Sequence, residues 1–192
     1  MDDERLRFLV VKAHPHDFTH VAGTLGVHTS LGDSVTVVVA TSGAFTHNEK
    51  LAAELKKPAE ERDPAIINEP PDKYAAEKAE ELRNAAALFG VTDIRILPGP
   101  QPFIANESPE IAQQIAEIIL EVRPHVLVTQ SPYLHGAGTR GRSSGYLGDD
   151  HIQTAFAVQD AQYLANSPRP GARHAPHRIA ATLYPGVYFS SE

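Results

Sequence analysis

The 192-residue chain contains no cysteine. This absence excludes disulfide bonds, thiolate catalysis and cysteine-based zinc sites, so a bound metal would be held by histidine and carboxylate side chains. It also agrees with a reducing compartment, and we expect the protein to be cytoplasmic.

Long apolar runs and basic stretches are missing as well. No run approaches the roughly 20 apolar residues of a membrane span, and the acidic start MDDERLRFLVV is unlike a signal peptide. The formal net charge is -7, and lysine and arginine form no block or stripe. We therefore expect neither a membrane nor a nucleic acid as partner, and we interpret residues 1–192 as a single soluble domain.

Three common catalytic signatures are also absent. The first apolar run is followed by AHPHDF and not by the GxGxxG of dinucleotide-binding folds. Neither a GxSxG nucleophile elbow nor a phosphate-binding P-loop occurs. These absences argue against dinucleotide-dependent, serine-hydrolase and nucleotide-phosphatase chemistry.

Apolar periodicity predicts strands that alternate with helices. Short β-branched runs predict strands at 7–12, 34–41, 93–97, 125–129 and either 180–183 or 187–189. Helical spacing predicts helices at 18–30, 49–55, 73–89, 109–122 and 150–164. The alternation indicates an α/β fold of Rossmann-like type, a three-layer sandwich in which a mostly parallel sheet carries helices on both faces.

Histidine and aspartate are concentrated next to the ends of the predicted strands. His14 and Asp17 follow the first predicted strand directly, and His151 lies at the start of the last predicted helix. Ligands of open α/β folds bind at the carboxyl ends of the strands. Two histidines and one carboxylate, with a position left for water, are the donor set of a catalytic divalent-metal site. We therefore predict that His14, Asp17 and His151 bind a metal.

The motifs and their order resemble the PIG-L/LmbE family of zinc-dependent N-acetylglucosaminyl deacetylases. The matching pieces run over roughly residues 5–165 and are AHPHDF at 13–18, AGTLG at 22–26, VTVVVATSG at 35–43, KAEELRNAAALFG at 78–90 and GDDH at 148–151. The resemblance implies zinc as cofactor, bound by His14, Asp17 and His151. It also implies an N-deacetylase in which zinc-bound water is the nucleophile.

The sequence departs from the family pattern near the expected metal. His16 stands where the family has an aspartate that acts as general base, and Gly148 stands where it has a histidine that helps to stabilise the oxyanion. His16 could still accept a proton, could bind the metal as an extra ligand, or could mark lost activity. Asp150, which matches the aspartate of the family's HPDH motif, is a second candidate for the base.

Expected substrate contacts differ as well. Lys78 stands where the family has an arginine, and Gln101 stands where it has an aspartate that often binds a hydroxyl group of the sugar substrate. The Gly-rich stretch after the fourth predicted strand indicates a lid over the site, from which His135, Arg140 or Arg142 could stabilise negative charge. We predict Lys78, Gln101, His135 and Arg140 as substrate-binding residues.

Together these features predict a zinc-dependent hydrolase that removes an acyl group from an N-acylated amino sugar or a related small amide. Another divalent metal could take the place of zinc. The changed residues leave two alternatives. One is a metal-retaining sugar-binding or regulatory protein that does not hydrolyse amides. The other is a different metal reaction on a substrate without an N-acetyl sugar. We expect a small-molecule substrate, and the resemblance implies a homo-oligomer such as a trimer or hexamer.

Overall fold

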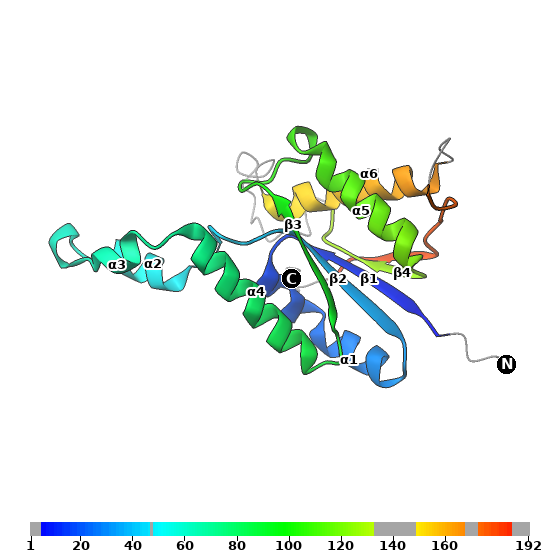
Figure 1. The fold of residues 1–192 in the computed structure, drawn as a ribbon, viewed down its shortest axis with the longest axis horizontal. Coiled ribbons are helices and arrows are strands. Elements are labelled where there is room, and N and C mark those ends of the chain that lie inside the picture. The colour runs from blue at the N-terminus through cyan, green and yellow to red at the C-terminus, as the bar shows by residue number, and fades with distance from the viewer. Residues whose placement is uncertain (1–4, 47, 133–148, 168–172, 186–192) are drawn as a thin grey trace, which may run out of the picture.

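The fold is built on one parallel β-sheet (Figure 1). The computed structural model describes residues 5–46, 48–132, 149–167 and 173–185. Within these residues, five parallel strands lie in the order β3-β2-β1-β4-β5. Their bounds are β1 Arg7–Lys12, β2 Ser34–Thr41, β3 Asp93–Gly99, β4 Val126–Val128 and β5 Ala181–Leu183.

Helices cover both faces of this sheet, with α1 and α4 on one face and α5 and α6 on the other (Figure 1). The α-helices are α1 Ala22–Ser30, α2 Glu49–Leu55, α3 Pro64–Ile67, α4 Pro71–Ala87, α5 Pro109–Val122 and α6 Asp150–Asn166. The described residues also form short 3-10 helices, η1 Pro15–His20, η2 Ala59–Glu61 and η3 Ala105–Glu107. No helix in the described ranges is both long enough and apolar enough to cross a membrane. The predicted fold class is confirmed.

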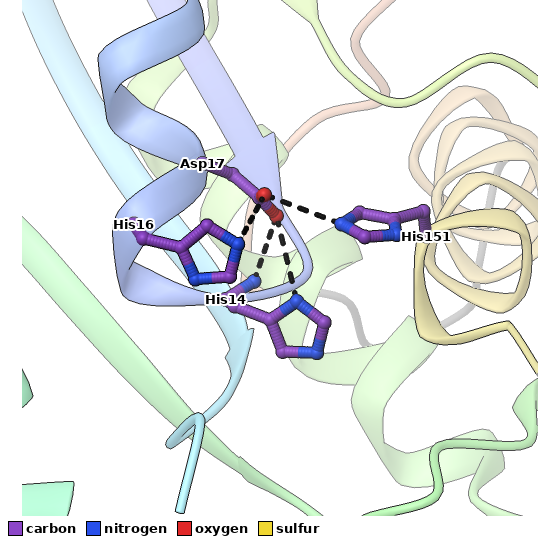
Figure 2. Close-up of side chains that lie close together, drawn as sticks. All are labelled: His14, His16, Asp17 and His151. Atoms are coloured by element: carbon purple, nitrogen blue, oxygen red, sulfur yellow. Dashed lines mark hydrogen bonds and ion pairs between the residues drawn. The ribbon is translucent and has the colours of Figure 1, made fainter. Parts of the chain in front are cut away.

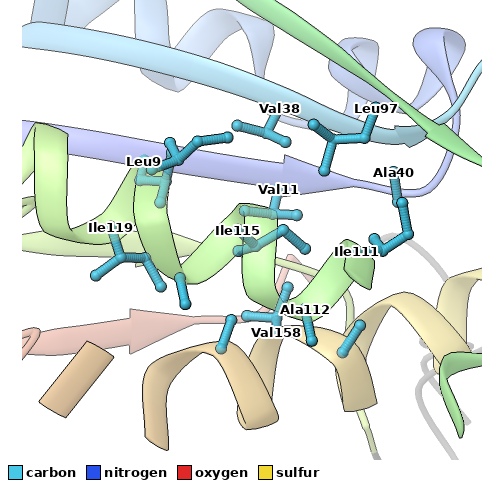
Figure 3. Close-up of a cluster of buried hydrophobic side chains, with 14 of the residues drawn as sticks. Leu9, Val11, Val38, Ala40, Leu97, Ile111, Ala112, Ile115, Ile119 and Val158 are labelled. Carbon is cyan, nitrogen blue, oxygen red and sulfur yellow. The ribbon is translucent and has the colours of Figure 1, made fainter. Parts of the chain in front are cut away.

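Alternation of side chains along β1 divides the core into two clusters. Leu9 and Val11 pack with residues of α5 and α6, as Figure 3 shows, whereas Phe8 and Val10 pack with residues of α1 and α4. The strand is apolar on both faces because helices bury both faces, as expected for a central parallel strand. Helix α5 contributes the predicted stripe of buried isoleucines at 111, 115, 118 and 119.

Element boundaries differ from the predictions in places. The helix predicted at 18–30 is divided into η1 and α1, because Val21 has φ -131° and ψ -4°, outside the α-helical region. Helix α4 begins at Pro71, two residues earlier than predicted, since proline suits the first turn of a helix. Of the two predicted final strands, the one at 180–183 corresponds to β5, and the one at 187–189 lies outside the described residues.

The strand order reverses between β1 and β4. Strands β2 and β3 lie on one side of β1, while β4 and β5 lie on the other. In open α/β sheets, ligands bind outside the carboxyl ends of the strands at such a reversal. The turn that contains His14 and Asp17 follows β1 directly, so the fold places these residues at the expected ligand site.

A lysine is buried where β1 ends. Lys12 is fully buried, and its ammonium group has no hydrogen-bond partner among the described residues. Burial lowers the pKa of Lys12 from 10.5 to about 8, although the negative charge of Asp17 partly opposes this shift. A protonated Lys12 therefore destabilises the folded protein.

We expect Lys12→Met to stabilise the metal-free protein by up to about 3 kcal/mol at pH 7, since one pKa unit corresponds to about 1.36 kcal/mol. The penalty in the wild type is complete below about pH 8. It declines between about pH 8 and 10.5, where the folded protein has released a proton that the unfolded chain still binds. Denaturant unfolding across this pH range, with exposed Lys56→Met as control, measures the difference. Equal stability of Lys12→Met and wild type at pH 7 would contradict the prediction.

Candidate metal centre

The turn after β1 is shaped by a local exchange of hydrogen bonds between His14 and Asp17. The backbone N–H of Asp17 donates to the carbonyl oxygen of His14 at 3.1 Å, and the backbone N–H of His14 donates to Asp17 Oδ2 at 3.0 Å. Pro15 occupies the first position of η1, where its missing N–H costs nothing. This reciprocal capping turns both side chains toward the same space.

The end of β2 holds the same turn from its other side. The Thr41 hydroxyl and the Thr41 backbone N–H both donate to the carbonyl oxygen of Ala13, at 3.0 and 3.1 Å. Gly43 follows with a φ of +72°, and a Cβ atom there would lie only 2.9 Å from the Pro15 ring. Glycine is therefore required at this position both by its backbone angle and by the close approach of Pro15.

Four donor atoms converge beyond this turn (Figure 2). Each lies within 4.8 Å of the other three, and they belong to His14, His16, Asp17 and His151. Asp17 Oδ1 is 3.2 Å from His16 Nε2 and 3.2 Å from His151 Nε2. Donors around a tetrahedral zinc at about 2.1 Å lie roughly 3.4 Å from one another. The spacing and the chemical nature of these donors therefore fit a divalent transition metal.

Three of these donors are oriented by a second contact on their other polar atom. His14 Nε2 is 2.8 Å from Asp150 Oδ2, and His151 Nδ1 is 2.9 Å from Asp149 Oδ1. Asp17 Oδ2 accepts a hydrogen bond of 3.0 Å from Gln130 Nε2. Contacts of this kind fix the tautomer and ring orientation of metal-binding histidines.

The buried Nδ1 of His14 is the strongest sign that the centre is built for a ligand. It has no hydrogen-bond partner among the described residues, although His14 is almost completely buried. A buried ring nitrogen without a partner is costly in free energy unless something binds it. A metal ion would satisfy this atom together with Asp17 Oδ1 and His151 Nε2.

The electrostatics of the cluster favour a cation. Burial by itself would raise the pKa of Asp17, but its hydrogen bond to His151 and the nearby His151, His16 and His14 rings hold that pKa well below its usual range. Burial opposes a charge on His151, yet its hydrogen bonds to Asp149 and Asp17 raise its pKa to about 10. A proton on His151 therefore supplies the positive charge that the two carboxylates attract in the metal-free protein.

A cavity of about 560 Å³ opens at the donor cluster. Residues of four segments line it, namely His14, Phe45, Thr46, Gln101, Pro102, Asp149, Asp150 and His151. A smaller cavity of about 180 Å³ lies between η1 and α4, and its lining includes His16, Lys78 and Glu81. The larger cavity has the size of a small-molecule site and reaches two of the four donors.

The predicted catalytic and substrate-binding residues occupy different surroundings. Asp150 lies in the larger cavity, where its Oδ2 contacts His14 and its Oδ1 accepts the backbone N–H of Phe103 at 2.7 Å. Gln101 lines the same cavity, whereas Lys78 lines the smaller one and forms an ion pair with Glu81 at 2.6 Å.

The three residues named for the predicted lid lie outside the described part of the chain. These are His135, Arg140 and Arg142, and the same holds for Gly148. Their assignment to the substrate site stays a prediction.

Comparison with known families identifies the chain. The family model described as PIG-L, GlcNAc-PI de-N-acetylase, matches residues 9–162. The chain belongs to the PIG-L family. The matched range contains all four donors and the second contacts that orient three of them. The resemblance inferred from the sequence motifs is confirmed.

Relatives of this PIG-L chain include deacetylases of an acetamido sugar. The 1D-myo-inositol 2-acetamido-2-deoxy-alpha-D-glucopyranoside deacetylase of Thermomonospora curvata is 31% identical over 189 residues, which cover 89% of this chain and 57% of the relative. The protein of the same name from Thermobispora bispora is 32% identical over 197 residues, covering 93% of this chain and 58% of the relative. The chain thus spans a little over half the length of these curated relatives.

Solved structures share the fold of this PIG-L chain. The N,N'-diacetylchitobiose deacetylase of Pyrococcus horikoshii has a TM-score of 0.65 at 20% identity, covering 86% of this chain and 52% of that one. The 4-carboxy-2-hydroxymuconate hydratase of Pseudomonas putida has a TM-score of 0.63 at 20% identity, covering 91% and 62%. The same fold therefore occurs in proteins named for different reactions, so the fold alone does not fix the chemistry.

Sequence reasoning missed Asp149 and Gln130, two of the residues that orient the donors of this PIG-L chain, and it predicted the third, Asp150, only as a candidate base. Asp149 is the N-cap of α6 and accepts the backbone N–H of His151 at 2.8 Å while it also contacts the His151 ring. An aspartate directly before a predicted helix is a recognisable cap signal. Gln130 gave no comparable signal, since a glutamine after a strand has many ordinary explanations.

With Zn²⁺ as the probe metal, we expect Asp149→Asn to weaken binding at the candidate centre by about 10- to 100-fold, because asparagine still caps α6 but lacks the carboxylate that orients His151. Competition with a chromogenic chelator measures the dissociation constant. The matched control is Asp160→Asn, an exposed position on the same helix, which should bind zinc as the wild type does. Unchanged affinity in Asp149→Asn would show that this carboxylate does not support the centre.

Proposed function

We propose that this chain carries the catalytic centre of a zinc-dependent hydrolase that removes the acyl group from an N-acylated amino sugar or a related small amide. The observation that carries the proposal is the convergence of His14, Asp17 and His151 at the cavity of about 560 Å³. Membership of the PIG-L family and the acetamido-sugar deacetylases among the relatives support the same reaction class.

Zinc is the metal that we propose for the centre. The donors are three imidazoles and one carboxylate, and imidazole ligands suit zinc and other late first-row metals better than magnesium or calcium. Such a metal would be held by His14 Nδ1, Asp17 Oδ1 and His151 Nε2. When bound, it would lower the pKa of a coordinated water molecule to about 7 and polarise the amide carbonyl.

We propose that Asp150 positions His14 and does not serve as the base. Its Oδ2 contacts His14 Nε2 at 2.8 Å and also accepts a bond of 3.2 Å from Gln101 Nε2, while its Oδ1 accepts a backbone N–H. A carboxylate engaged on both oxygens is poorly placed to take a proton from a reacting group. With its Nε2 held in this way, His14 keeps Nδ1 directed at the metal position.

We propose that His16 acts as a fourth metal donor. Its Nε2 lies 3.2 Å from Asp17 Oδ1, and its ring is stacked at 11° on that of His14, with the ring centres 5.3 Å apart. His16 lines the smaller cavity and is not among the residues that line the larger one. These contacts favour a ligand over a base that faces the substrate.

The presence of four protein donors also supports a second function. Four protein donors are typical of structural zinc sites, which leave no position for a substrate. If His16 closes the centre in this way, the chain would retain the metal and bind a sugar or regulate a partner without hydrolysis. Zinc can also take a fifth ligand during catalysis, so a fourth protein donor remains compatible with hydrolysis.

The substrate and the wider setting are proposals as well. We propose a small N-acylated molecule as substrate, approached through the larger cavity, with Gln101 at its rim and Lys78 beside the smaller cavity. A cytoplasmic location and a homo-oligomeric state stay expectations from the sequence.

The hydrolase proposal predicts zinc-dependent release of acetate. Purified protein loaded with zinc should deacetylate N-acetylglucosamine conjugates, and a chelator should abolish turnover until zinc is restored. His14→Ala should reduce turnover at least about 100-fold, because it removes a proposed metal donor. Fluorescamine detection of the released amine measures the rate. A fully zinc-loaded wild type that hydrolyses none of a broad panel of acylated amines would favour the second function.

The role of His16 predicts a specific effect on metal affinity. If His16 is a fourth donor, His16→Ala should weaken zinc binding by more than about tenfold. If it is instead the base, zinc affinity should stay unchanged while the turnover number falls by about 10²- to 10⁴-fold. His28→Ala on α1, which removes a histidine paired with Asp33, is the control for loss of an imidazole elsewhere. Chelator competition and turnover measured on the same samples separate the two roles.

A further inference from the structure

A large aromatic side chain stands exposed at the rim of the metal cavity. Phe45 lies in the loop after β2, and it is 70% exposed although it lines the cavity together with His14 and His151. A phenyl ring exposed to this extent gains little from folding, because most of its apolar surface stays in water. The ring is therefore available to a molecule that enters the cavity.

The backbone that carries this ring is held in place by Gln101. The Phe45 backbone N–H donates to Gln101 Oε1 at 3.2 Å, and Gln101 Nε2 donates to the Thr46 hydroxyl at 2.8 Å. The same Nε2 contacts Asp150 Oδ2 at 3.2 Å, and Asp150 holds His14. A continuous set of hydrogen bonds thus links the position of Phe45 to the orientation of a metal donor.

These bonds also occupy both polar atoms of the Gln101 side chain. Its oxygen accepts from the loop backbone and its nitrogen donates to Thr46 and Asp150, so both atoms already have partners within the protein. The neighbouring Pro102 ring offers no donor. Thr46 also lines the cavity, and its hydroxyl oxygen accepts the Gln101 bond. On this side of the cavity, the described residues therefore present the apolar surface of Phe45 and Pro102 beside polar atoms that already have a partner within the protein.

We propose that Phe45 is a specificity-determining residue that receives an apolar substituent, aryl or alkyl, of the substrate whose amide lies at the metal centre. The inference rests on the proposed function, because that function defines where the amide is bound. Burial of a phenyl ring against such a group stabilises the complex, and the gain applies only to substrates that carry the group. The substrate class is then an N-acylated amine with an apolar arm.

Paired ligands test this inference. N-acetylglucosamine and its phenyl β-glycoside share the acetamide and differ in one aryl group. For the phenyl glycoside, Phe45→Ala should raise KM by about tenfold, whereas Phe45→Leu, which keeps an apolar side chain, should raise it about threefold or less. For N-acetylglucosamine itself, neither variant should change KM by more than about twofold. An equal KM for the phenyl glycoside in wild type and Phe45→Ala overturns the proposal.

A binding measurement that needs no turnover is available because the chain contains no tryptophan. Phe45→Trp places a single fluorescent indole at the cavity, and Tyr163→Trp places one at a position that is 74% exposed on α6 and outside the cavity lining. The phenyl glycoside should change the emission of Phe45→Trp saturably and at lower concentration than N-acetylglucosamine, and it should leave Tyr163→Trp unchanged. If N-acetylglucosamine changes the emission equally well, the ring stacks on the sugar and the apolar-arm proposal is wrong.

The two readouts distinguish this inference from the proposed hydrolase. Preferential binding of the phenyl glycoside to Phe45→Trp without any turnover in the wild type supports the role of Phe45 and contradicts hydrolysis. Turnover that does not depend on Phe45 supports hydrolysis and contradicts the role of Phe45. Because Phe45 is largely exposed, its variants should unfold at the same temperature as the wild type, which thermal unfolding verifies.

Discussion

The buried carboxylate of Asp17 is the group on which the centre depends. Its Oδ2 accepts the His14 backbone N–H and the Gln130 amide, so one atom joins the turn after β1 to the end of β4. Its Oδ1 faces His16 and His151 at 3.2 Å each. A fully buried carboxylate is costly unless it is neutralised and hydrogen-bonded. The hydrogen bonds from His14 and Gln130 meet one condition, and a proton on His151 or a bound cation would meet the other. This requirement explains why so many polar groups are gathered at one point of an apolar core.

The sheet brings these groups together because its strand order reverses between β1 and β4. The reversal places a polar turn after β1 beside the residue that follows β4, and α6 then starts at the same end with Asp149 and Asp150. Each of these aspartates supports a different histidine. The acidic pair at the start of one helix thus orients two of the histidines proposed to bind the metal, which lie 137 positions apart in the sequence (14 and 151).

Two features of the centre set this chain apart from the PIG-L pattern that its motifs resemble. His16 brings a third imidazole to the donors, and Gln101 is tied into a network that ends at His14. Both changes alter the surroundings of the centre, whereas the three donors that match the family pattern, His14, Asp17 and His151, are retained. Proteins with this fold bear names of different reactions, so such local differences are where specificity and chemistry are decided.

Strands, helices and the short-range spacing of site residues could be predicted from the sequence. The β-branched runs of β1 and β2, the isoleucine stripe of α5 and the spacing of His14 to Asp17 all depend on neighbours within a few positions, where helix and strand periodicity act. The tertiary structure alone decided the rest. Asp150 contacts His14 across 136 positions, and Gln130 donates to Asp17 across 113. The Gln101 side chain is bound to residues about 50 positions away on either side. Contacts over such separations follow from strand order and packing, which no local pattern encodes. The sequence by itself therefore determined which groups could bind a metal, and the fold determined which atom of each group is left to bind it.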